Sequence, residues 1–519
     1  MAREPGSARR QRRRRAGGGK APAGSAIEQL PWRQPELTFP PQELLNQEQL
    51  DIIHQASLKI LKDIGMEFMS ADARDRLKKA GADVNEETHM VRFDPAMVEE
   101  LIKTAPSMFT LHARNPEKNL KIGGRYIVNG CVSSPPNVSC MDKGRRPGST
   151  EDFQNLLRLS QYFNIIHLIG GYPVEPLDRA VSTRHLYNTR DMLTLTDKAI
   201  SVYCIWGKRV SDAIEMVRIG RGISNEQLEK EPSCFTVINT NSPLKFDGMM
   251  LDGLIEMSSR NQVICVTPFT LAGAMAPITL AGALAQQNAE ALAGLVMTQI
   301  VRPGAPFVYG GFTSNVDMKS GAPAFGTPEY MKTAIIGGQL ARRYNVPYRT
   351  SGVNAANTVD AQAAYESVFS LWGTTMGGGN IIKHAAGWME GGLVASYEKL
   401  ILDVDLLQMV SEFLKPVMVN EDTLGFDSIV QAGVGGHFFG TSHTQERYKD
   451  AFYAPMISDW RNYESWEEAG SPRAWQKANK IWKQALEDYV EPPIDSAILE
   501  ELDAHIAKIS DAGGIGTDF

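Results

Sequence analysis

The sequence predicts an α/β fold: a (β/α)8 TIM-type barrel with an N-terminal α+β cap region and C-terminal helices. Three observations lead to this class. Short apolar runs that suit buried strands alternate with amphipathic stretches of helical spacing, which is typical of parallel β/α units. Eight such runs are spread over roughly 280 residues, and this spacing favours a closed barrel. No Gly-x-Gly-x-x-Gly motif follows the first run, which weakens the alternative of a doubly wound open sheet.

The N-terminal part divides into a basic tail and a cap region. Residues 1–35 include "ARRQRRRRAGGGKAPAGSA", which we expect to be a disordered tail, although a basic run can also bind nucleic acid or anionic lipid or act as an address. Gly, Ala and Pro follow the arginines in place of an apolar segment, so we do not expect the tail to be a secretory signal. Residues 36–150 alternate short helical patterns with hairpin-like pieces and form the predicted cap region.

Residues 151–447 contain the predicted barrel. We expect its eight strands in the runs "NIIHLIGG", "AISVYCIWG", "CFTVINTN", "QVICVTPF", "PFVYGGF", "PYRTSGV", "NIIKHAAG" and "GGHFFG". Helical stretches such as "QQNAEALAGLVMTQIV" separate them. Residues 448–519 are Trp-rich and charged, then helical, and we expect them to form a C-terminal extension on the outside of the barrel.

Composition narrows the function classes. The chain has 519 residues, of which 43% are hydrophobic and 22% charged, as in an ordinary globular protein. Its net charge of −7 argues against nucleic acid as the main partner, and no apolar run is long enough to predict a membrane span. The five cysteines form no CxxC pair, and His437 and His443 have no cysteine near them, so no metal site is indicated. We expect a cytoplasmic protein.

In a barrel of this kind, the chemistry lies on the loops that follow the strands. Here those loops are rich in Gly, Asn, Ser and aromatic residues, and several resemble one family. "KSGAPAFGTPEY", "DAQAAYES", "HAAGWMEGGLVASYEKLILD" and "GGHFFGTSHTQERY" are similar to the trimethylamine:corrinoid methyltransferase family, as is the N-terminal "VRFDPAMVEELIKTAPSMFTLHARNP". The resemblance implies a (β/α)8 barrel that moves a methyl group from a methylated amine to the cobalt of a separate corrinoid protein.

The resemblance also bears on cofactor, partner and substrate. It implies that this chain binds no cofactor itself and that a cognate corrinoid protein carries the corrinoid. Apart from the resemblance, the large apolar helices leave room for a self-associating face, so a homo-oligomer is possible. Founding members of the family carry pyrrolysine in the loop after the sixth strand, where this chain has ordinary residues and Asn357 is the best match. A quaternary ammonium already has the fixed charge that lets its nitrogen leave as a neutral amine. The resemblance therefore implies the branch without pyrrolysine, whose activity includes glycine betaine demethylation.

Alternatives remain open for both the function and the site. Trimethylamine, a sulfonium compound, or a barrel that binds betaines without turnover are the other functions considered. Aromatic faces suit an onium group, arginine suits a carboxylate, and neutral amides suit a pocket that protonates nothing. Each such side chain also has an ordinary structural explanation, in the core or at a helix start. The catalytic candidates are Glu366, Glu390 and His384; the substrate-binding candidates are Tyr309, Phe312, Arg349, Asn354, Asn357, Gln362, Tyr365, Trp388 and Phe439.

Overall fold

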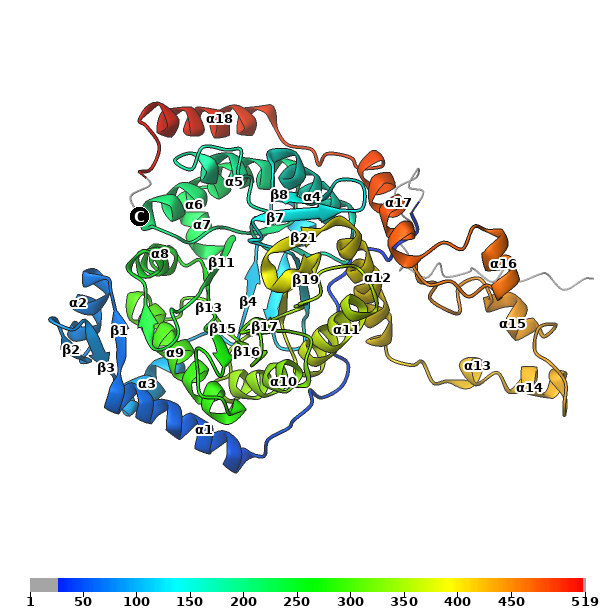
Figure 1. Cartoon of the computed structure of the whole chain (residues 1–519), viewed down its shortest axis with the longest axis horizontal. Coiled ribbons are helices and arrows are strands. Elements are labelled where there is room, and N and C mark those ends of the chain that lie inside the picture. Colours follow the sequence, from blue (N-terminus) through cyan, green and yellow to red (C-terminus); the bar gives the residue numbers. More distant parts are fainter. Residues whose placement is uncertain (1–26, 517–519) are drawn as a thin grey trace, which may run out of the picture.

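The chain folds around one closed barrel of parallel strands (Figure 1). The computed structural model describes residues 27–516. Within these residues, each of the eight barrel strands is followed by at least one helix, so the predicted fold class is confirmed. In the order in which they pair around the barrel, the strands are β10 (Ala199–Ser201), β11 (Cys234–Ile238), β13 (Val263–Val266), β15 (Phe307–Gly310), β18 (Tyr348–Ser351), β19 (Ile381–Ala386), β6 (Val128–Cys131) and β9 (Leu168–Ile169).

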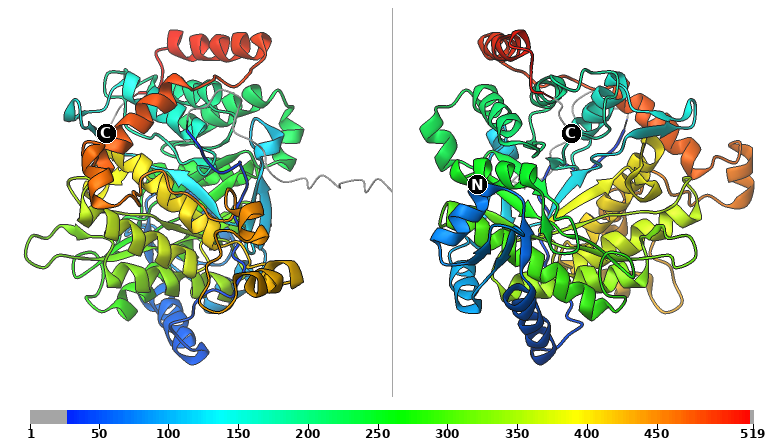
Figure 2. Two further views of the ribbon diagram at one scale, coloured as in Figure 1. Left: turned by 90° about the vertical axis from the view of Figure 1, so that its right-hand side faces the viewer. Right: turned by 60° about the vertical axis from the view of Figure 1, so that its left-hand side comes forward.

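Helices form the outer ring of the barrel (Figure 2). Several begin at a side chain that accepts a hydrogen bond from the first turn, as Thr279, Thr327 and Asp360 do. These helices are α4 (Thr150–Tyr162), α5 (Arg184–Leu195), α6 (Gly207–Arg221), α7 (Asn225–Lys230), α8 (Gly248–Ser259), α9 (Leu280–Val301), α10 (Pro328–Arg343), α11 (Ala361–Met376) and α12 (Tyr397–Phe413).

Seven of the eight predicted strand runs contain a barrel strand, and the eighth prediction is wrong. The run "GGHFFG" at residues 435–440 forms no strand and is exposed. Gly433 and Gly435 adopt positive φ angles there, and glycine weakens a strand. The barrel is closed by β6, which pairs with β19 and β9 and lies inside the predicted cap region. β6 was missed because its sequence "VNGC" is short and not apolar throughout.

The end of the barrel from which the strands start is closed by apolar side chains. A hairpin of β4 (Met108–Leu111) and β5 (Leu120–Gly123) covers this end. Its Leu111 and Ile122 pack with the inward side chains of the barrel strands, which include Phe235, Val308 and Ile381. These residues form a solid floor, so a ligand can enter only from the opposite end, where the strands finish.

The segment before this hairpin also packs against the closed end. Of the predicted tail, residues 1–26 lie outside the described residues, whereas the prediction of disorder is wrong for residues 27–35. Ile27 is buried, and the backbone N–H of Leu30 donates to the side-chain oxygen of Gln408 at 2.8 Å. The aromatic ring of Trp32 meets that of His167 edge-on. The segment is held because its apolar residues cover the floor.

The N-terminal cap is a small α+β unit on the side of the barrel (Figures 1 and 2). Its helices pack against α9, and its sheet has the order β12-β1-β3-β2. The strand β12 comes from the loop after β11 and pairs in parallel with β1, which ties the cap to the barrel. The elements are α1 (Gln47–Lys59), a π-helical turn η1 (Ile60–Ile64), β1 (Met66–Phe68), α2 (Ala71–Lys79), β2 (Asp83–Asn85), β3 (Met90–Arg92), α3 (Pro95–Ile102) and β12 (Lys245–Phe246). The 3-10 turn η2 (Pro116–Lys118) joins β4 to β5.

Two small sheets extend the barrel wall at its open end. One contains β14 (Phe269–Ala272), β16 (Phe312–Val316) and β17 (Pro323–Ala324). The other contains β20 (Trp388–Met389), β21 (Val394–Ser396), β7 (Asn137–Cys140) and β8 (Gly144–Pro147), with the 3-10 turn η3 (Glu390–Gly392) between β20 and β21.

The C-terminal part is helical, as the sequence predicts. The helix α17 packs along α12, and α18 packs on α6 and α5 (Figure 1). None of the helices among residues 27–516 combines the length and the hydropathy that crossing a bilayer requires. The C-terminal helices are α13 (Glu421–Leu424), α14 (Phe426–Ala432), α15 (Ser442–Arg447), α16 (Tyr463–Glu468), α17 (Ala474–Glu487) and α18 (Ser496–Asp511).

Candidate active site

A cavity of about 310 Å³ lies inside the open end of the barrel. Residues from the ends of β6, β9, β10, β11, β18 and β19 line it, together with Phe312 of β16 and Trp388 of β20. This is the end of a (β/α)8 barrel at which ligands bind, because side chains from several strands converge there.

Two basic side chains stand on the floor of the cavity. Successive residues of a strand point to opposite faces, so Ile381 joins the apolar floor while Lys383, two positions later, lines the cavity above it. Arg349 of β18 lines the cavity as well and is only 2% exposed. Its Nε and Nη1 atoms have no hydrogen-bond partner within residues 27–516. Burial, with Arg349 nearby, lowers the pKa of Lys383 to about 7.

No carboxylate lies beside these two cations among the described residues that line the cavity. An unpaired buried charge is unfavourable, and the favourable resolution is a partner of opposite charge. Arginine presents a planar fork of N–H groups that matches a carboxylate, and lysine adds a point charge. The floor is therefore suited to hold an anionic group, and the ligand has to bring that group with it.

A distortion in β19 turns a histidine into the same cavity. The pairing of β19 with β6 shifts register between Ile382 and Ala386, and His384 has a φ of 54°. A regular strand would place Lys383 and His384 on opposite faces, whereas the bulge allows both to line the cavity. The backbone N–H of Ser133 donates to Nδ1 of His384 at 3.3 Å. Burial, with Lys383 and Arg349 nearby, holds the pKa of His384 well below its ordinary value, so the ring is neutral.

Aromatic rings form the upper walls of the cavity. The ring of Trp388 lies 4.0 Å from that of His384 and edge-on to that of Phe312. On another side, the rings of Tyr172 and Tyr203 stack with their centroids 5.4 Å apart. The Nε1 atom of Trp388 is buried without a hydrogen-bond partner in the described part of the chain. These walls offer π-faces above a cationic floor.

A wider space of about 510 Å³ adjoins the cavity and leads outward. It shares Asn239, Phe312 and Trp388 with the inner cavity and is also lined by Phe269 and Met275. The loop after β11 on this side is fixed by Glu290, which accepts hydrogen bonds from the hydroxyl of Ser242 at 2.6 Å and from the backbone N–H of Leu244 at 2.9 Å. This outer space, which we call the vestibule, is thus partly apolar, and hydrogen bonds hold its loop in place.

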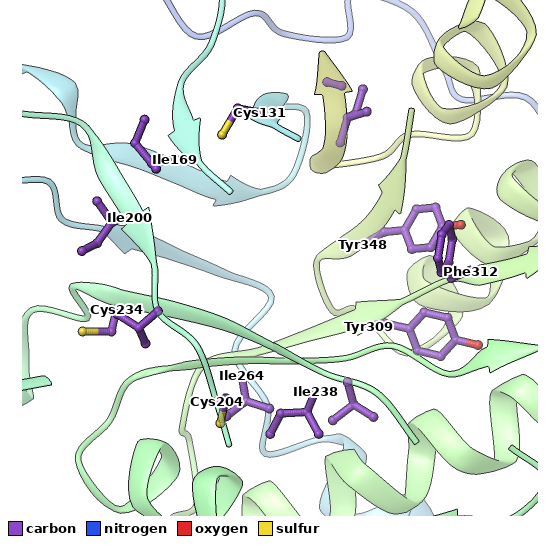
Figure 3. Close-up of a cluster of buried hydrophobic side chains, with 14 of the residues drawn as sticks. Cys131, Ile169, Ile200, Cys204, Cys234, Ile238, Ile264, Tyr309, Phe312 and Tyr348 are labelled. Atoms are coloured by element: carbon purple, nitrogen blue, oxygen red, sulfur yellow. The ribbon is translucent and has the colours of Figure 1, made fainter. Parts of the chain in front are cut away.

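The structure brings together four of the residues predicted from the sequence: Phe312, Arg349, His384 and Trp388 line the inner cavity. Tyr309 points the other way, toward α9, where its hydroxyl donates to the side-chain oxygen of Asn288 at 2.9 Å. Figure 3 shows Tyr309 beside Tyr348, and their ring centroids are 6.3 Å apart. Both rings belong to the packing between strands and helices, because alternate residues of a barrel strand face outward.

Three other aromatic and acidic candidates lie away from the cavity. Tyr365 is exposed on α11, and Phe439 is exposed because the strand that was expected to position it does not exist. Glu390 has a φ of 51° and forms an ion pair with Arg145, with 3.0 Å between the nearest nitrogen and oxygen atoms. It lines a different surface depression, together with Asn357.

The polar residues between β18 and α11 hold their own loop in shape. Glu366 accepts hydrogen bonds from the backbone N–H groups of Ala355 and Ala356 at 2.8 and 2.9 Å, and from the side chain of Gln362 at 2.7 Å. Asn354 donates to the backbone oxygen of Ala363 at 2.8 Å. Neither Asn354, Asn357, Gln362 nor Glu366 is among the residues that line the inner cavity.

Sequence reasoning missed several residues that line the cavity. Lys383 carried a detectable signal, since a lysine inside the apolar run "NIIKHAAG" is unusual for a buried strand. Tyr172 directly follows the predicted run "NIIHLIGG", and Tyr203 lies inside the predicted run "AISVYCIWG", but neither was chosen as a candidate. Ser133 and Ser134 follow β6, which was not recognised as a barrel strand.

Comparison with known proteins agrees with this architecture. The model of the trimethylamine methyltransferase family (MTTB) matches residues 9–514. The glycine betaine methyltransferase of Desulfitobacterium hafniense (strain Y51) is 35% identical over 471 residues, which are 91% of this chain and 98% of that protein. The trimethylamine methyltransferase MttB1 of Methanosarcina mazei is 28% identical over 477 residues, covering 90% of this chain and 95% of that protein. The crystal structure of the Methanosarcina barkeri monomethylamine methyltransferase superposes with a TM-score of 0.51 at 10% identity, covering 86% and 88% of the two chains, and supports the fold.

Barrel and cavity together are typical of an enzyme with a small binding site that is entered from the open end of the barrel. The chain belongs to the trimethylamine methyltransferase family, as its motifs suggested. It is a methyltransferase that acts on a methylated amine.

Proposed function

We propose that the protein transfers a methyl group from a quaternary amine that also carries a carboxylate, with glycine betaine as the leading substrate, to the corrinoid of a separate protein. The observation that carries this proposal is the floor of the cavity. Arg349 and Lys383 are buried there without an acidic partner among the lining residues, below aromatic walls. The activity for which the relative from D. hafniense Y51 is named, glycine betaine methyltransferase, agrees with it.

A zwitterion matches the two layers of the cavity. Its carboxylate meets the guanidinium of Arg349 and the ammonium of Lys383, where charge-assisted hydrogen bonds contribute about 1.5–3 kcal/mol each. The onium group then lies among Phe312, Trp388 and the stacked tyrosines, and each π-face contributes roughly 0.5–2 kcal/mol to its binding. Both charges of the ligand are then balanced inside one small cavity.

Trimethylamine is the weaker candidate because it has no carboxylate. As a cation it would enter a cavity whose floor already carries Arg349 and Lys383, and like charges in a desolvated space repel strongly. As a neutral amine it would leave both cations unpaired. The cavity floor therefore favours a substrate that carries a carboxylate over trimethylamine.

The chain's own residues orient the substrate and exclude water. A quaternary nitrogen leaves as a neutral amine, so the reaction requires no proton donor, and His384 is held neutral. Anchoring the carboxylate at the floor points the methyl groups toward the vestibule, and fixing the orientation of a reacting group lowers barriers by several kcal/mol. When bound, the reduced corrinoid supplies the nucleophilic cobalt that takes the methyl group.

The rim of the open end suits an incoming protein. Ile278, Met318 and Leu393 are exposed apolar residues on three loops of this end. The space next to Gly273 is bounded by both Met318 and Ile278, so these two side chains lie close together. Exposed apolar clusters at the edge of a cavity are typical of protein-binding surfaces. The partner that carries the corrinoid is expected to dock here.

The test supplies the protein with reduced cobalamin and one amine at a time. The absorption spectrum reports formation of the methyl–cobalt bond. We expect methylation with glycine betaine and none with trimethylamine at the same concentration. Methylation from trimethylamine alone would overturn the proposal. A Phe369→Ala variant, altered on the exposed surface of α11, is the matched control for effects of purification and storage.

A further inference from the structure

A buried ion pair lies where α12 packs on β19 and on the neighbouring helix α11 (Figure 1). Lys399 of α12 and Asp403, one helical turn later, are only 1% and 2% exposed. The ammonium nitrogen of Lys399 lies 2.6 and 2.7 Å from the two carboxylate oxygens of Asp403. The hydroxyl of Ser367 on α11 donates to Asp403 at 3.0 Å and accepts from Lys399 at 2.7 Å. These contacts hold the carboxylate of Asp403 in place.

The same carboxylate holds the backbone just after β19. The N–H of Gly387, the first residue after this strand, donates to Oδ2 of Asp403 at 2.9 Å. Gly387 has a φ of 96°, a conformation that favours glycine, so the chain changes direction at this point. On the other side of the turn, the N–H of Ser396 donates to the backbone oxygen of Gly387 at 2.9 Å. The backbone that enters β20 is therefore fixed from two sides.

Trp388 comes directly after this turn. Its ring lies 4.0 Å from that of His384, between ring centroids, and lines both the inner cavity and the vestibule. The indole also lies close to the backbone of Gly392, where an added Cβ atom would be 2.5 Å from Cζ2 of the ring. The ring has little room to shift on that side. Its position in the cavity wall therefore follows the backbone at Gly387.

Stability alone explains the ion pair poorly. Burying two charges costs free energy that their attraction often fails to repay, and apolar replacements of buried pairs are frequently neutral or stabilising. The helix α12 buries Leu400, Ile401 and Val404 as well, so its buried side is already rich in apolar side chains. An apolar side chain at position 403, however, could not accept the N–H of Gly387. What the charged pair adds is an acceptor held at one point.

We propose that Asp403 is a positioning residue that places Trp388 against the methylated nitrogen of the substrate. Lys399 orients the carboxylate, which acts through the N–H of Gly387 and lies outside the cavity. The inference rests on the proposed function in one respect, since it takes the onium group to lie at the aromatic wall. Without the acceptor, the π-face of Trp388 is presented at the wrong place, and substrate binding weakens while the fold persists.

Two double variants separate the acceptor from the charges. The acceptor variant, Lys399→Met with Asp403→Asn, removes both charges and keeps an amide oxygen for Gly387. The apolar variant, Lys399→Met with Asp403→Leu, has a side chain of the same branching and no acceptor. In calorimetric titration with glycine betaine, the acceptor variant should bind like the unaltered protein. The apolar variant should bind roughly 2–30-fold more weakly, the range for one misplaced π-face.

A second measurement follows Trp388 without any substrate. Labelling with 5-fluorotryptophan gives fluorine resonances for the eight tryptophans, and Trp388→Phe identifies the one of interest. We expect this resonance to shift in the apolar variant and to stay in place in the acceptor variant. The resonance of Trp206, which follows β10, is the internal control and should not move. If the apolar variant does not fold, Lys399→Met with Asp403→Ala replaces it with the same expectation.

Two results would overturn the proposal. One is an unchanged affinity or an unmoved Trp388 resonance in the apolar variant, and the other is an equal change in both double variants. A failure of the proposed function is seen elsewhere, because the unaltered protein would then not bind glycine betaine. In that case the fluorine spectra alone decide whether Asp403 positions Trp388.

Discussion

Arg349 and Lys383 place two positive charges inside the barrel at a considerable cost in desolvation. In a protein without a ligand such charges reduce stability, because the interior solvates them poorly. Their presence is therefore best understood through the ligand, whose carboxylate offsets that cost. Stability and affinity should consequently respond in opposite directions when one of the charges is removed.

Replacing Arg349 by methionine tests this opposition. The Arg349→Met variant should bind glycine betaine roughly 10–100-fold more weakly, since one charge-assisted pair of hydrogen bonds is lost. Its melting temperature without ligand should be unchanged or higher, because an unpaired buried charge has been removed. Calorimetric titration and thermal unfolding measure the two effects. An Arg349→Lys variant, which keeps the charge but loses the planar fork, should have intermediate affinity.

The lowered pKa of Lys383 predicts that substrate affinity depends on pH. Burial lowers the pKa of its ammonium group to about 7 in the free protein, and a bound carboxylate raises that pKa again. Below pH 7 the amine is already charged, so the dissociation constant is flat. Above pH 7 binding requires uptake of a proton, and the dissociation constant should rise by up to about tenfold per pH unit. Lys383→Met should bind weakly and lose this dependence; a slope that persists in the variant would assign it to another group.

At the scale of elements, the loop between β18 and α11 shows what sequence patterns reveal and what they leave open. Asn354 and Gln362 were predicted to bind substrate, and with Asp360 they form a cluster at the turn from β18 to α11. Its role in the structure is to satisfy the backbone of that turn and the start of α11. Side chains that brace a loop and side chains that contact a ligand have the same composition, so the sequence alone could not separate them.

Glu366 offers a quantitative test of this bracing. Glu366→Ala removes the acceptor for the N–H groups of Ala355 and Ala356, and the free energy of unfolding should fall by about 1–3 kcal/mol. Glu390→Ala is the matched control, because its partner Arg145 is half exposed and such pairs contribute about 0–1 kcal/mol. Urea denaturation measures both. Equal losses in the two variants would show that Glu366 does not brace the loop.

At the scale of the whole molecule, the sequence predicted the barrel but not β6, the strand that closes it. Apolar runs flanked by glycine and amphipathic helices identify most strands, since buried parallel strands leave a strong pattern. The sequence of β6 shows no such pattern, because Asn129 and Gly130 interrupt its apolar residues. Its place in the barrel depends on pairing with β19, which lies far along the chain. Arg349 and His384 lie near strand ends and line the cavity, as their place in the sequence predicted, whereas the inward direction of Lys383 and the outward direction of Tyr309 depend on register.

Two N-terminal truncations test how much the segment that covers the closed end contributes to the melting temperature. A chain that begins at residue 42 loses the burial of Ile27 and Leu37, which contributes about 1.5–3 kcal/mol each, and the hydrogen bond from Leu30 to Gln408. Its melting temperature should fall by roughly 5–10 °C. A chain that begins at residue 27 keeps these contacts and should melt at a higher temperature than the chain that begins at residue 42. Thermal unfolding followed by circular dichroism decides between the outcomes.

The pairing of β6 with β19 has a consequence during synthesis on the ribosome. β6 emerges before every other barrel strand, and β19 is the last to appear. Until then the nascent sheet has two open edges, and such edges recruit foreign strands. The growing polypeptide is therefore exposed to aggregation until β19 has been made, and a pause before codon 386 would prolong that exposure.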